Sequence, residues 1–326
     1  MKKKIALVTG GFSGEAEISY KSAITVANNI DLNLFDYYTI DINPSGWFYN
    51  NENNESCEVN KTDFTIIFNQ QKIVFDVVLM CIHGTPGEDG KLQGYFDLLQ
   101  IPYTSCDTAT SALTFNKRYT LAVAAFGGIK VAKSVHLFKD SQYTIEKILQ
   151  QIQTPVFVKP NNGGSSLGMS KVVDSKQLQT AINKAFEVDD QVLVEEMIQG
   201  REFTIGVYKS KNELIALPIT EIITQNEFFD YEAKYLGKSE EITPASITDS
   251  IKNQIEEAAK KIYQLLNCRG IVRIDFIYNE KELQPYMLEV NTVPGQSQAS
   301  IVPQQVLAKG LTLKEFYTDI IQNAIQ

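Results

Sequence analysis

The order of apolar runs, glycine turns and helical patterns constrains the fold of this chain more than any other feature. Residues 4–10, KIALVTG, form a short apolar run that ends in glycine, and residues 13–30 place apolar side chains at roughly helical spacing. Residues 75–84, FDVVLMCIHG, repeat the apolar run, and a glycine-rich segment then leads to a helical pattern at 92–100. Strand, turn and helix in this repeated order predict a parallel α/β layer. We expect this first domain to span residues 1–104.

A small α+β domain is predicted for residues 105–199. A helical pattern begins at Asp107, a residue type that caps helices, and stops at the glycine pair 127–128. Short apolar runs then flank a segment rich in glycine and serine, and an amphipathic helical pattern leads into a further strand. The expected strands are 154–160, 169–173 and 191–198, and the expected helix is 175–186.

The remaining residues, 200–326, predict a second α+β domain. Its strongest helical pattern covers residues 250–267. Residues 223–244 have no clean period and are too many for an ordinary connection, so we expect a lid loop there. The expected strands are two consecutive ones at 201–210 and 213–222 and a C-terminal pair at 270–278 and 286–291.

The charge balance and the cysteines exclude several classes of protein. The chain has 326 residues and a formal net charge of -9, which disfavours a nucleic-acid-binding surface or an anionic membrane surface but allows a local basic pocket for phosphate. The cysteines are scattered, so we expect neither a zinc site nor a disulfide scaffold, and a reducing cytosol fits. The first apolar run is too short for a signal peptide, and no stretch reaches the roughly 20 apolar residues of a membrane helix. We therefore expect a cytoplasmic protein.

Two carboxylates share one face of the C-terminal strand pair. Arg273 and Asp275 are two apart on one strand, as are Glu289 and Asn291 on the next. A connection centred near residues 281–282 places Asp275 roughly opposite Glu289, and opposed side chains lie about 5 Å apart. Such carboxylates repel unless a cation joins them, and oxygen ligands without His or Cys favour Mg²⁺ or Mn²⁺. The alternative is a solvated polar face; the Pro-Gly turn that follows favours a site.

The segment KPNNGGSSLGMSK, residues 159–171, is the best candidate for holding phosphate. The chain has no GxxxxGK[ST] loop, and a metal with three side-chain ligands completes its shell with water and phosphate oxygens. The glycines expose backbone N–H groups, Ser165 and Ser166 add hydroxyl donors, and Lys159 adds a positive charge. The alternative is a passive turn or linker, which the apolar strands on both sides disfavour.

Six segments carry a family pattern in a fixed order. They are GGFSGEAEIS (10–19), IHGTPGEDGKLQGYFDLLQIPYTS (82–105), VKPNNGGSSLGMSKV (158–172), FFDYEAKY (228–235), GIVRIDF (270–276) and EVNTVPGQSQASIVP (289–303). Together they resemble the D-alanine–D-alanine ligase family of the ATP-grasp superfamily. Each segment is moderately specific, and all six in order are highly specific. Gln296 departs from the Met often found at its position, and residues 43–72 match no motif.

The resemblance implies an ATP-grasp fold and a two-step reaction. The carboxylate of one D-alanine attacks the γ-phosphate of ATP to give an acyl phosphate, and the amine of a second D-alanine then attacks the acyl carbon. D-alanyl-D-alanine, ADP and phosphate leave, and the dipeptide feeds peptidoglycan synthesis in a bacterial cytoplasm. The family also implies a homodimer, while the charge balance and the short apolar runs indicate no nucleic-acid or membrane partner.

The resemblance also implies a role for each candidate residue, because phosphoryl transfer depends on charge neutralisation and alignment. Two Mg²⁺ (or Mn²⁺) ions would bind Asp275, Glu289 and Asn291. ATP would contact Lys117, Lys159, Ser166 and Lys234 at its phosphates, Glu195, Glu196, Met197 and Ile198 at adenine, and Glu202 at ribose. The amino acids would contact a hydrogen-bonded triad of Glu15, Ser165 and Tyr235, an oxyanion hole of Arg273 and the Gly295 N–H, Ser300 at the second carboxylate, and His83 near the first substrate.

Several candidates also have ordinary structural explanations. Glu15 suits the start of a helix, His83 suits a turn, and Lys234 and Tyr235 suit an exposed loop. His136 lies in no motif, and we expect it to be structural.

Two other functions stay open at this point. One is another ATP-grasp carboxylate–amine ligase with different amino-acid substrates. The other is a nucleotide-binding module without catalysis, which has no need of the oxyanion donor Arg273 beside a metal. In the ligase family a tyrosine at the position of Tyr235 favours an amine over a hydroxyl as the attacking group.

Overall fold

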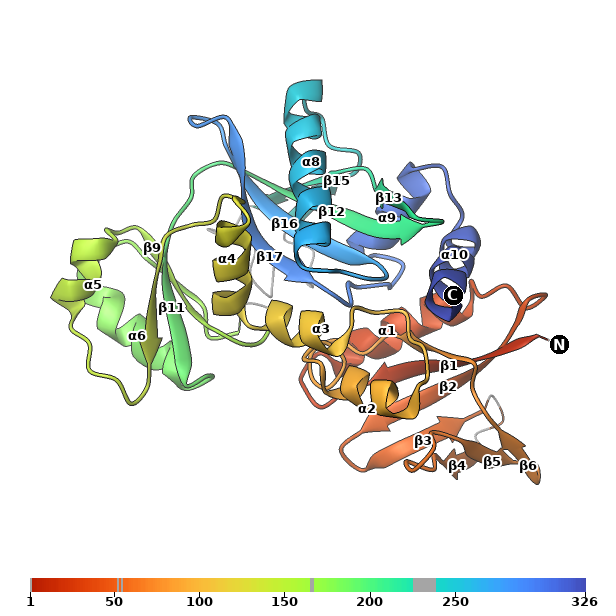
Figure 1. The fold of residues 1–326 in the computed structure, drawn as a ribbon. Helices are drawn as coiled ribbons and strands as arrows, with labels where there is room; N and C mark the ends of the chain where they lie inside the picture. The colour runs from red at the N-terminus through yellow and green to blue at the C-terminus, as the bar shows by residue number, and fades with distance from the viewer. Residues whose placement is uncertain (1, 52, 54, 165–166, 225–238) are drawn as a thin grey trace.

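The computed structural model describes residues 2–51, 53, 55–164, 167–224 and 239–326. Three main sheets follow one another along the chain, each with helices packed on it. In Figure 1 the N-terminal sheet lies at the lower right, the middle sheet at the left and the C-terminal sheet above and between them. The expected combination of α/β and α+β domains is confirmed.

The N-terminal sheet has a parallel centre and an antiparallel edge. Its strands are β1 (Lys3–Gly10), β2 (Phe35–Asn43), β3 (Gly46–Asn50), β4 (Ser56–Glu58) and β7 (Val77–Met80), with a separate hairpin of β5 (Ile66–Phe68) and β6 (Gln71–Ile73). The order is β4-β3-β2-β1-β7, and β1 is parallel to both β2 and β7. The helices α1 (Ala16–Ala27) and α2 (Lys91–Leu99) follow the first and last of these parallel strands, as the sequence predicts.

The antiparallel edge comes from residues 43–56, a polar segment that matches no family motif. It forms β3 and the start of β4. Trp47 lies edge-on to Phe64 and Tyr95, and aromatic pairs of this kind add stability beyond their buried area. These long-range contacts, which no local pattern reveals, let a polar segment form strands.

The middle sheet is antiparallel and packs both of its helices on one face. Its strands are β8 (Ser134–Phe138), β9 (Val156–Pro160), β10 (Ser170–Val172) and β11 (Gln191–Glu196), in the order β10-β9-β11-β8. The helices α5 (Ile145–Gln151) and α6 (Leu178–Phe186), the latter after a short 3₁₀ turn at Ser175–Gln177, cover this face. Val156, Val158 and Val192 point into that core, so the residues between them face away from it.

The expected helix over residues 107–127 is wrong in one respect, because it breaks at Asn116. α3 (Thr108–Phe115) begins with the predicted Asp107 cap, whose side chain accepts from a backbone N–H. At Asn116 the backbone is extended, and its side chain caps α4 (Lys117–Phe126) in the same way. Asparagine is a favoured capping residue, so it starts a new helix here.

The C-terminal sheet contains the strand pair that carries the two carboxylates. Its strands are β12 (Arg201–Ser210), β13 (Glu213–Ala216), β14 (Thr220–Thr224), β15 (Ser239–Ile242), β16 (Val272–Asn279) and β17 (Gln284–Asn291), in the order β15-β14-β12-β16-β17 with β13 also on β12. The single strand expected over 213–222 divides around Pro218, whose missing N–H cannot join a ladder. The expected lid, residues 223–244, begins and ends in β14 and β15, which pair with each other; residues 225–238 lie outside the described residues.

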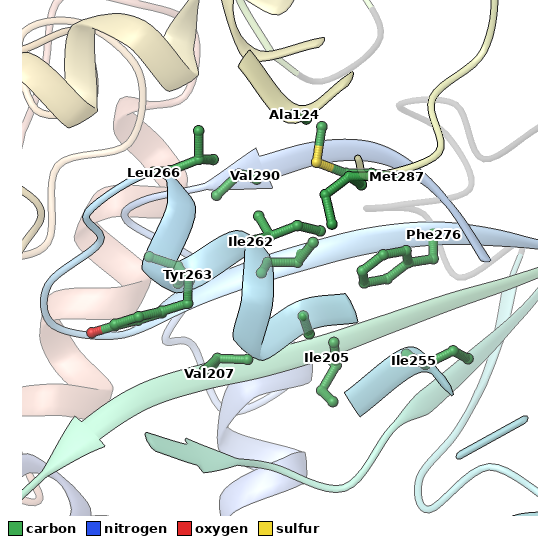
Figure 2. Packing of buried hydrophobic residues seen from close by; sticks show 14 of the residues in the cluster. Ala124, Ile205, Val207, Ile255, Ile262, Tyr263, Leu266, Phe276, Met287 and Val290 are labelled. Atoms are coloured by element: carbon green, nitrogen blue, oxygen red, sulfur yellow. The ribbon is translucent and has the colours of Figure 1, made fainter. Parts of the chain in front are cut away.

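One long helix covers one face of this sheet. α8 (Asp249–Leu265) packs Ile255 and Ile262 against Ile205, Phe276 and their neighbours (Figure 2). Burying each such side chain contributes about 1.5–3 kcal/mol. Ala124 of α4 joins the same cluster (Figure 2), so α4 packs with the C-terminal sheet, although the sequence places it in the middle domain. The domain limits at 104/105 and 199/200 stay predictions.

Two C-terminal helices join the first and last sheets. α9 (Ile301–Ala308) and α10 (Leu313–Ile325) share a buried cluster with β1, β7 and β12. In it Phe316 lies edge-on to Tyr208 of β12, with ring centroids 5.2 Å apart. Across the described part of the chain, we find no helix with the length and apolar character needed to cross a membrane.

Candidate active site

Two adjoining cavities lie where the three sheets face one another. The larger has a volume of about 1490 Å³ and the smaller a volume of about 320 Å³. Both are lined by Glu15 of the N-terminal domain, Lys117 at the start of α4, the loop glycines 163–164 and Glu289 of β17. The cavities therefore meet beside the carboxylate-bearing strand pair.

Each candidate residue that the structure describes lines one or both cavities. The larger cavity is lined by Glu15, Lys117, Lys159, Glu195, Glu196, Met197, Ile198, Glu202, Asp275 and Glu289. The smaller is lined by Glu15, His83, Lys117, Arg273, Glu289, Asn291, Gly295 and Ser300. Four candidates, Ser165, Ser166, Lys234 and Tyr235, lie outside the described residues.

The strand pair opposes its two carboxylates in the register that the sequence predicts. Asp275 of β16 pairs with Glu289 of β17, and Arg273 pairs with Asn291. Asp275 is 7% exposed. Its carboxylate accepts from Arg273 Nε at 2.9 Å and Nη2 at 2.8 Å, and also from Thr204 Oγ1 and Asn291 Nδ2. This dense set of donors stabilises a negative charge away from bulk water.

The oxygen donors fit a hard divalent cation that also binds phosphate. Across the described ranges, no group of three or more His, Cys, Asp or Glu side chains is placed to hold a metal. Asp275, Glu289 and the amide of Asn291 offer hard oxygen ligands but too few to complete a Mg²⁺ shell, which water and phosphate oxygens usually fill. This set suits a cation that arrives with a nucleotide.

A buried ion pair lines the larger cavity. Lys159 Nζ lies 2.6 Å from Glu195 Oε1, and the two side chains are 12% and 5% exposed. They come from neighbouring strands, β9 and β11, on the face that turns away from the helices of the middle domain. The other oxygen, Glu195 Oε2, is buried and has no hydrogen-bond partner among the described residues. Buried acceptors are rarely left this way, so this atom fits a donor on a ligand.

The glycine loop between β9 and β10 is tied to the start of α4. Lys117 donates its backbone N–H to the carbonyl of Asn161 at 3.2 Å and its Nζ to the carbonyl of Gly163 at 2.6 Å. A Cβ added to Gly164 would lie 2.8 Å from Glu15 Oε1. A side chain at position 164 would displace the Glu15 carboxylate, so the loop approaches the N-terminal domain closely, which disfavours the alternative of a passive linker.

His83 connects the N-terminal domain to the turn that contains Gly295. Its Nδ1–H donates to the carbonyl of Val293 at 2.8 Å, and its Nε2 accepts from Ser22 Oγ at 2.9 Å. Ser22 Oγ accepts in turn from the backbone N–H of Gln296 at 3.1 Å. Burial lowers the pKa of His83 to about 4, so the ring is neutral at pH 7. With both ring nitrogens engaged, His83 is suited to positioning the turn.

Glu88 is a site residue that the sequence patterns do not single out. It lines the smaller cavity and accepts from the N–H of Gly84 at 2.7 Å and of Val293 at 3.3 Å. Burial, reinforced by the nearby Glu15, raises the pKa of Glu88 to about 8, so it is protonated at neutral pH. Its place in the GEDG part of a family segment is the sequence feature that could have identified it. No sequence feature identifies Thr204 as a site residue, because its pairing with Asp275 joins strands distant in sequence.

Known proteins match this chain from end to end. A family model described as D-ala D-ala ligase N-terminus matches residues 4–106, and one described as D-ala D-ala ligase C-terminus matches residues 115–322. A D-alanine--D-alanine ligase of Flavobacterium johnsoniae is 43% identical over 320 residues, 98% of each chain. The solved VanG D-Ala:D-Ser ligase of Enterococcus faecalis has a TM-score of 0.90 and 34% identity, covering 99% of this chain and 100% of that one. A Bacillus anthracis D-alanine--D-alanine ligase complexed with ATP has a TM-score of 0.79 and 26% identity, covering 99% and 97%.

Proposed function

The chain belongs to the D-alanine–D-alanine ligase family, and from that premise we propose how its two cavities divide the reaction. The enzyme joins two D-alanine molecules to D-alanyl-D-alanine with ATP, and the dipeptide serves peptidoglycan synthesis. Its fold is the ATP-grasp fold that the sequence segments imply. We assign the larger cavity to ATP and the smaller to the two amino acids.

The larger cavity offers groups suited to the adenine, the ribose and the phosphates of a nucleotide. The buried Glu195 Oε2, which no described residue bonds, is matched by the exocyclic amino group of adenine, which is a hydrogen-bond donor. Met197, Ile198 and Glu202 line the same cavity, and we assign the backbone at Met197 and Ile198 to adenine and Glu202 to the ribose, as the family implies. Lys159 and Lys117 place positive charge toward the phosphates, beside glycines whose N–H groups suit phosphate oxygens.

The smaller cavity suits two small zwitterions in sequence. Glu15 binds the ammonium of the first D-alanine, and protonated Glu88 beside it keeps the net negative charge low. Arg273 and the N–H of Gly295 stabilise the oxyanion of the tetrahedral intermediate; losing one such donor costs on the order of 10² to 10³ in rate. Ser300, at the start of α9, binds the carboxylate of the second D-alanine.

The metal hypothesis assigns Mg²⁺ or Mn²⁺, as two ions, to Asp275, Glu289 and Asn291. Such ions supply charge neutralisation on the β- and γ-phosphates. Asp275 is already held in place by Arg273 and Thr204, so the chain orients this carboxylate independently of any cation. Four candidates outside the described residues keep the roles that the family implies: Ser165, Ser166, Lys234 and Tyr235.

One observation supports assigning ATP and the amino acids to different cavities. Glu289 and Glu15 line both cavities, so the γ-phosphate of ATP and the carboxylate of the first D-alanine can meet where the cavities join. Phosphate release from ATP and Mg²⁺ tests it, with D-alanine, D-serine, D-lactate and L-alanine offered singly and in pairs. We expect release that requires D-alanine and is lost in Asp275→Asn. Release with L-alanine but not D-alanine would support the other ATP-grasp ligases instead, and tight ATP binding without release would support a non-catalytic module.

We also propose that the enzyme works as a cytoplasmic homodimer, as is typical of the family. Sedimentation of the purified chain tests the oligomeric state: a single species of twice the chain mass supports it, and a monomer at all concentrations contradicts it.

A further inference from the structure

Glu241 lines the smaller cavity but has no role in the reaction described so far. The sheet register places it on the catalytic face. Glu241 of β15 pairs with Ile222 of β14, and Ile222 pairs with Glu202 of β12. Two residues further along β12, Thr204 pairs with Asp275. Because directly paired residues share a face and alternate residues return to it, Glu241 lies on the same face as Asp275.

Helix α9 holds the Glu241 carboxylate at the end of the cavity that Ser300 occupies. Gln304 Nε2 donates to Glu241 Oε2 at 2.9 Å and to the carbonyl of Ala299 at 3.0 Å. Ser300 is the N-cap residue just before α9, so the Gln304 side-chain amide joins the Glu241 carboxylate to the turn that presents Ser300. Glu241 is therefore linked through one side chain to the turn that presents Ser300, the residue assigned to the carboxylate of the second D-alanine.

The other carboxylates of this cavity are engaged elsewhere. Over the described ranges, the cavity is lined by four of them: Glu15, Glu88, Glu241 and Glu289. Glu15 is assigned to the first ammonium, and Glu88 accepts two backbone N–H groups. Glu289 opposes Asp275 in the metal-binding pair. Glu241 is the carboxylate left for the second amino acid.

The surroundings of Glu241 favour a base. Among the described residues, the charged side chains that line this cavity with Glu241 are Arg273 from β16, Glu289 from β17, Glu15 just before α1, Lys21 from α1, Lys117 from α4, and Glu88 from the loop after β7. Burial raises the pKa of Glu241, an effect that the Gln304 hydrogen bond and Arg273 partly oppose. A carboxylate with a raised pKa holds a proton more strongly than an exposed one.

We propose that Glu241 accepts a proton from the ammonium of the second D-alanine and so makes its nitrogen a nucleophile. This rests on the proposed function of the cavity. An N–H bond of the ammonium breaks and the proton moves to the carboxylate. The nitrogen lone pair forms a C–N bond to the acyl carbon, the C–O bond to phosphate breaks, and the second proton lost by nitrogen leaves with the phosphate.

Hydroxylamine separates this step from the first half of the reaction. It is a free amine at neutral pH, so it traps D-alanyl phosphate as the hydroxamate without needing a base. Wild type, Glu241→Gln and Glu240→Gln are compared for hydroxamate formation, dipeptide formation and thermal unfolding. Glu240 is the exposed neighbour on the opposite face of β15, which makes its variant the matched control.

We expect Glu241→Gln to keep hydroxamate formation within about twofold and to lose dipeptide formation on the order of 10²-fold, the usual size of a general-base effect. The remaining dipeptide rate of Glu241→Gln should rise about tenfold per pH unit, because solvent then deprotonates the ammonium of the second D-alanine. The dipeptide rates of wild type and Glu240→Gln should depend less steeply on pH. Wild-type dipeptide rates in Glu241→Gln, or equal losses of hydroxamate and dipeptide, would overturn the proposal. A wild-type protein that forms neither product from D-alanine would instead refute the proposed function, and this step with it.

Discussion

Replacing Lys159 by Met removes one charge of the buried ion pair while keeping most of the aliphatic length. Lys159 Nζ lies 2.6 Å from Glu195 Oε1, and the side chains are 12% and 5% exposed. Because Glu195 Oε2 already lacks a partner in the described part of the chain, the variant leaves both carboxylate oxygens buried with no hydrogen-bond donor from those residues. Breaking a buried pair by removing one partner costs about 3–5 kcal/mol. We expect a loss of that size in the free energy of unfolding at pH 7.

Urea unfolding followed by circular dichroism measures this loss in a double-mutant cycle. Glu195→Gln keeps an acceptor for Lys159, so we expect it to cost about 1–2 kcal/mol. Adding Glu195→Gln to Lys159→Met removes the stranded charge and should recover about 2 kcal/mol. The control is Lys139→Met, which breaks an exposed pair with Asp190 whose side chains are 55% and 79% exposed; it should cost no more than about 1 kcal/mol.

Two results would refute this reasoning. One is equal stability of Lys159→Met and the double variant, because the stranded carboxylate would then carry no cost. The other is a loss in Lys159→Met no larger than in Lys139→Met, because burial would then make no difference to the pair.

Three further predictions concern the turn around Gly295. The Tyr317 hydroxyl donates to Gln296 Oε1 at 3.1 Å and both residues are buried, so Tyr317→Phe should lower the free energy of unfolding in urea by about 1–3 kcal/mol. Adding Gln296→Met should restore most of that stability; no recovery would mean that the lost hydrogen bond does not cause the destabilisation. Burial lowers the pKa of His83 to about 4, so the unfolded chain binds the proton first as pH falls below about 6.5, and the His83 contribution to the free energy of unfolding should fall by about 2 kcal/mol between pH 6.5 and 5. It is measured as the difference between wild type and His83→Asn, because Glu88, whose pKa burial raises to about 8, contributes in the opposite direction over the same range. His83→Asn should lack that loss, and an unchanged pH dependence would contradict the assignment. A Cβ on Gly295 would lie 2.7 Å from Ser300 Oγ, so Gly295→Ala should displace this hydroxyl from the carboxylate of the second D-alanine and raise the KM for that substrate; a wild-type KM would contradict the assignment of Ser300.

The pairing of the two C-terminal strands could be predicted from local sequence because its register depends on one short connection. The polar segment around residues 281–282 fixes which residues of β16 and β17 face each other, so Asp275 and Glu289 could be placed opposite one another from sequence. The glycine loop and the first parallel strands could also be predicted, since apolar runs, turns and helical spacing are all local patterns. Together with the strand pair they are sufficient to predict where the site lies.

Contacts between distant segments could not be read in this way. Thr204 and Glu241 join the catalytic face through strands that pair across long connections, and nothing near them in sequence marks the partner. Asn116 and Pro218 change the expected elements through single backbone groups, a cap and a missing N–H. Glu88 becomes a neutral acid only because folding buries it beside Glu15. In each case the deciding interaction exists only after folding.

The fate of the carboxylate oxygens of D-alanine tests the central claim most directly. D-alanine labelled with ¹⁸O in both carboxylate oxygens is incubated with the enzyme, ATP and Mg²⁺, and the dipeptide and phosphate are analysed by mass spectrometry. If the carboxylate of the first D-alanine attacks the γ-phosphate of ATP where the cavities join, each phosphate released will carry one ¹⁸O. Phosphate and D-alanyl-D-alanine will then form in equal amounts. Unlabelled phosphate, or phosphate formed without dipeptide, would contradict the account.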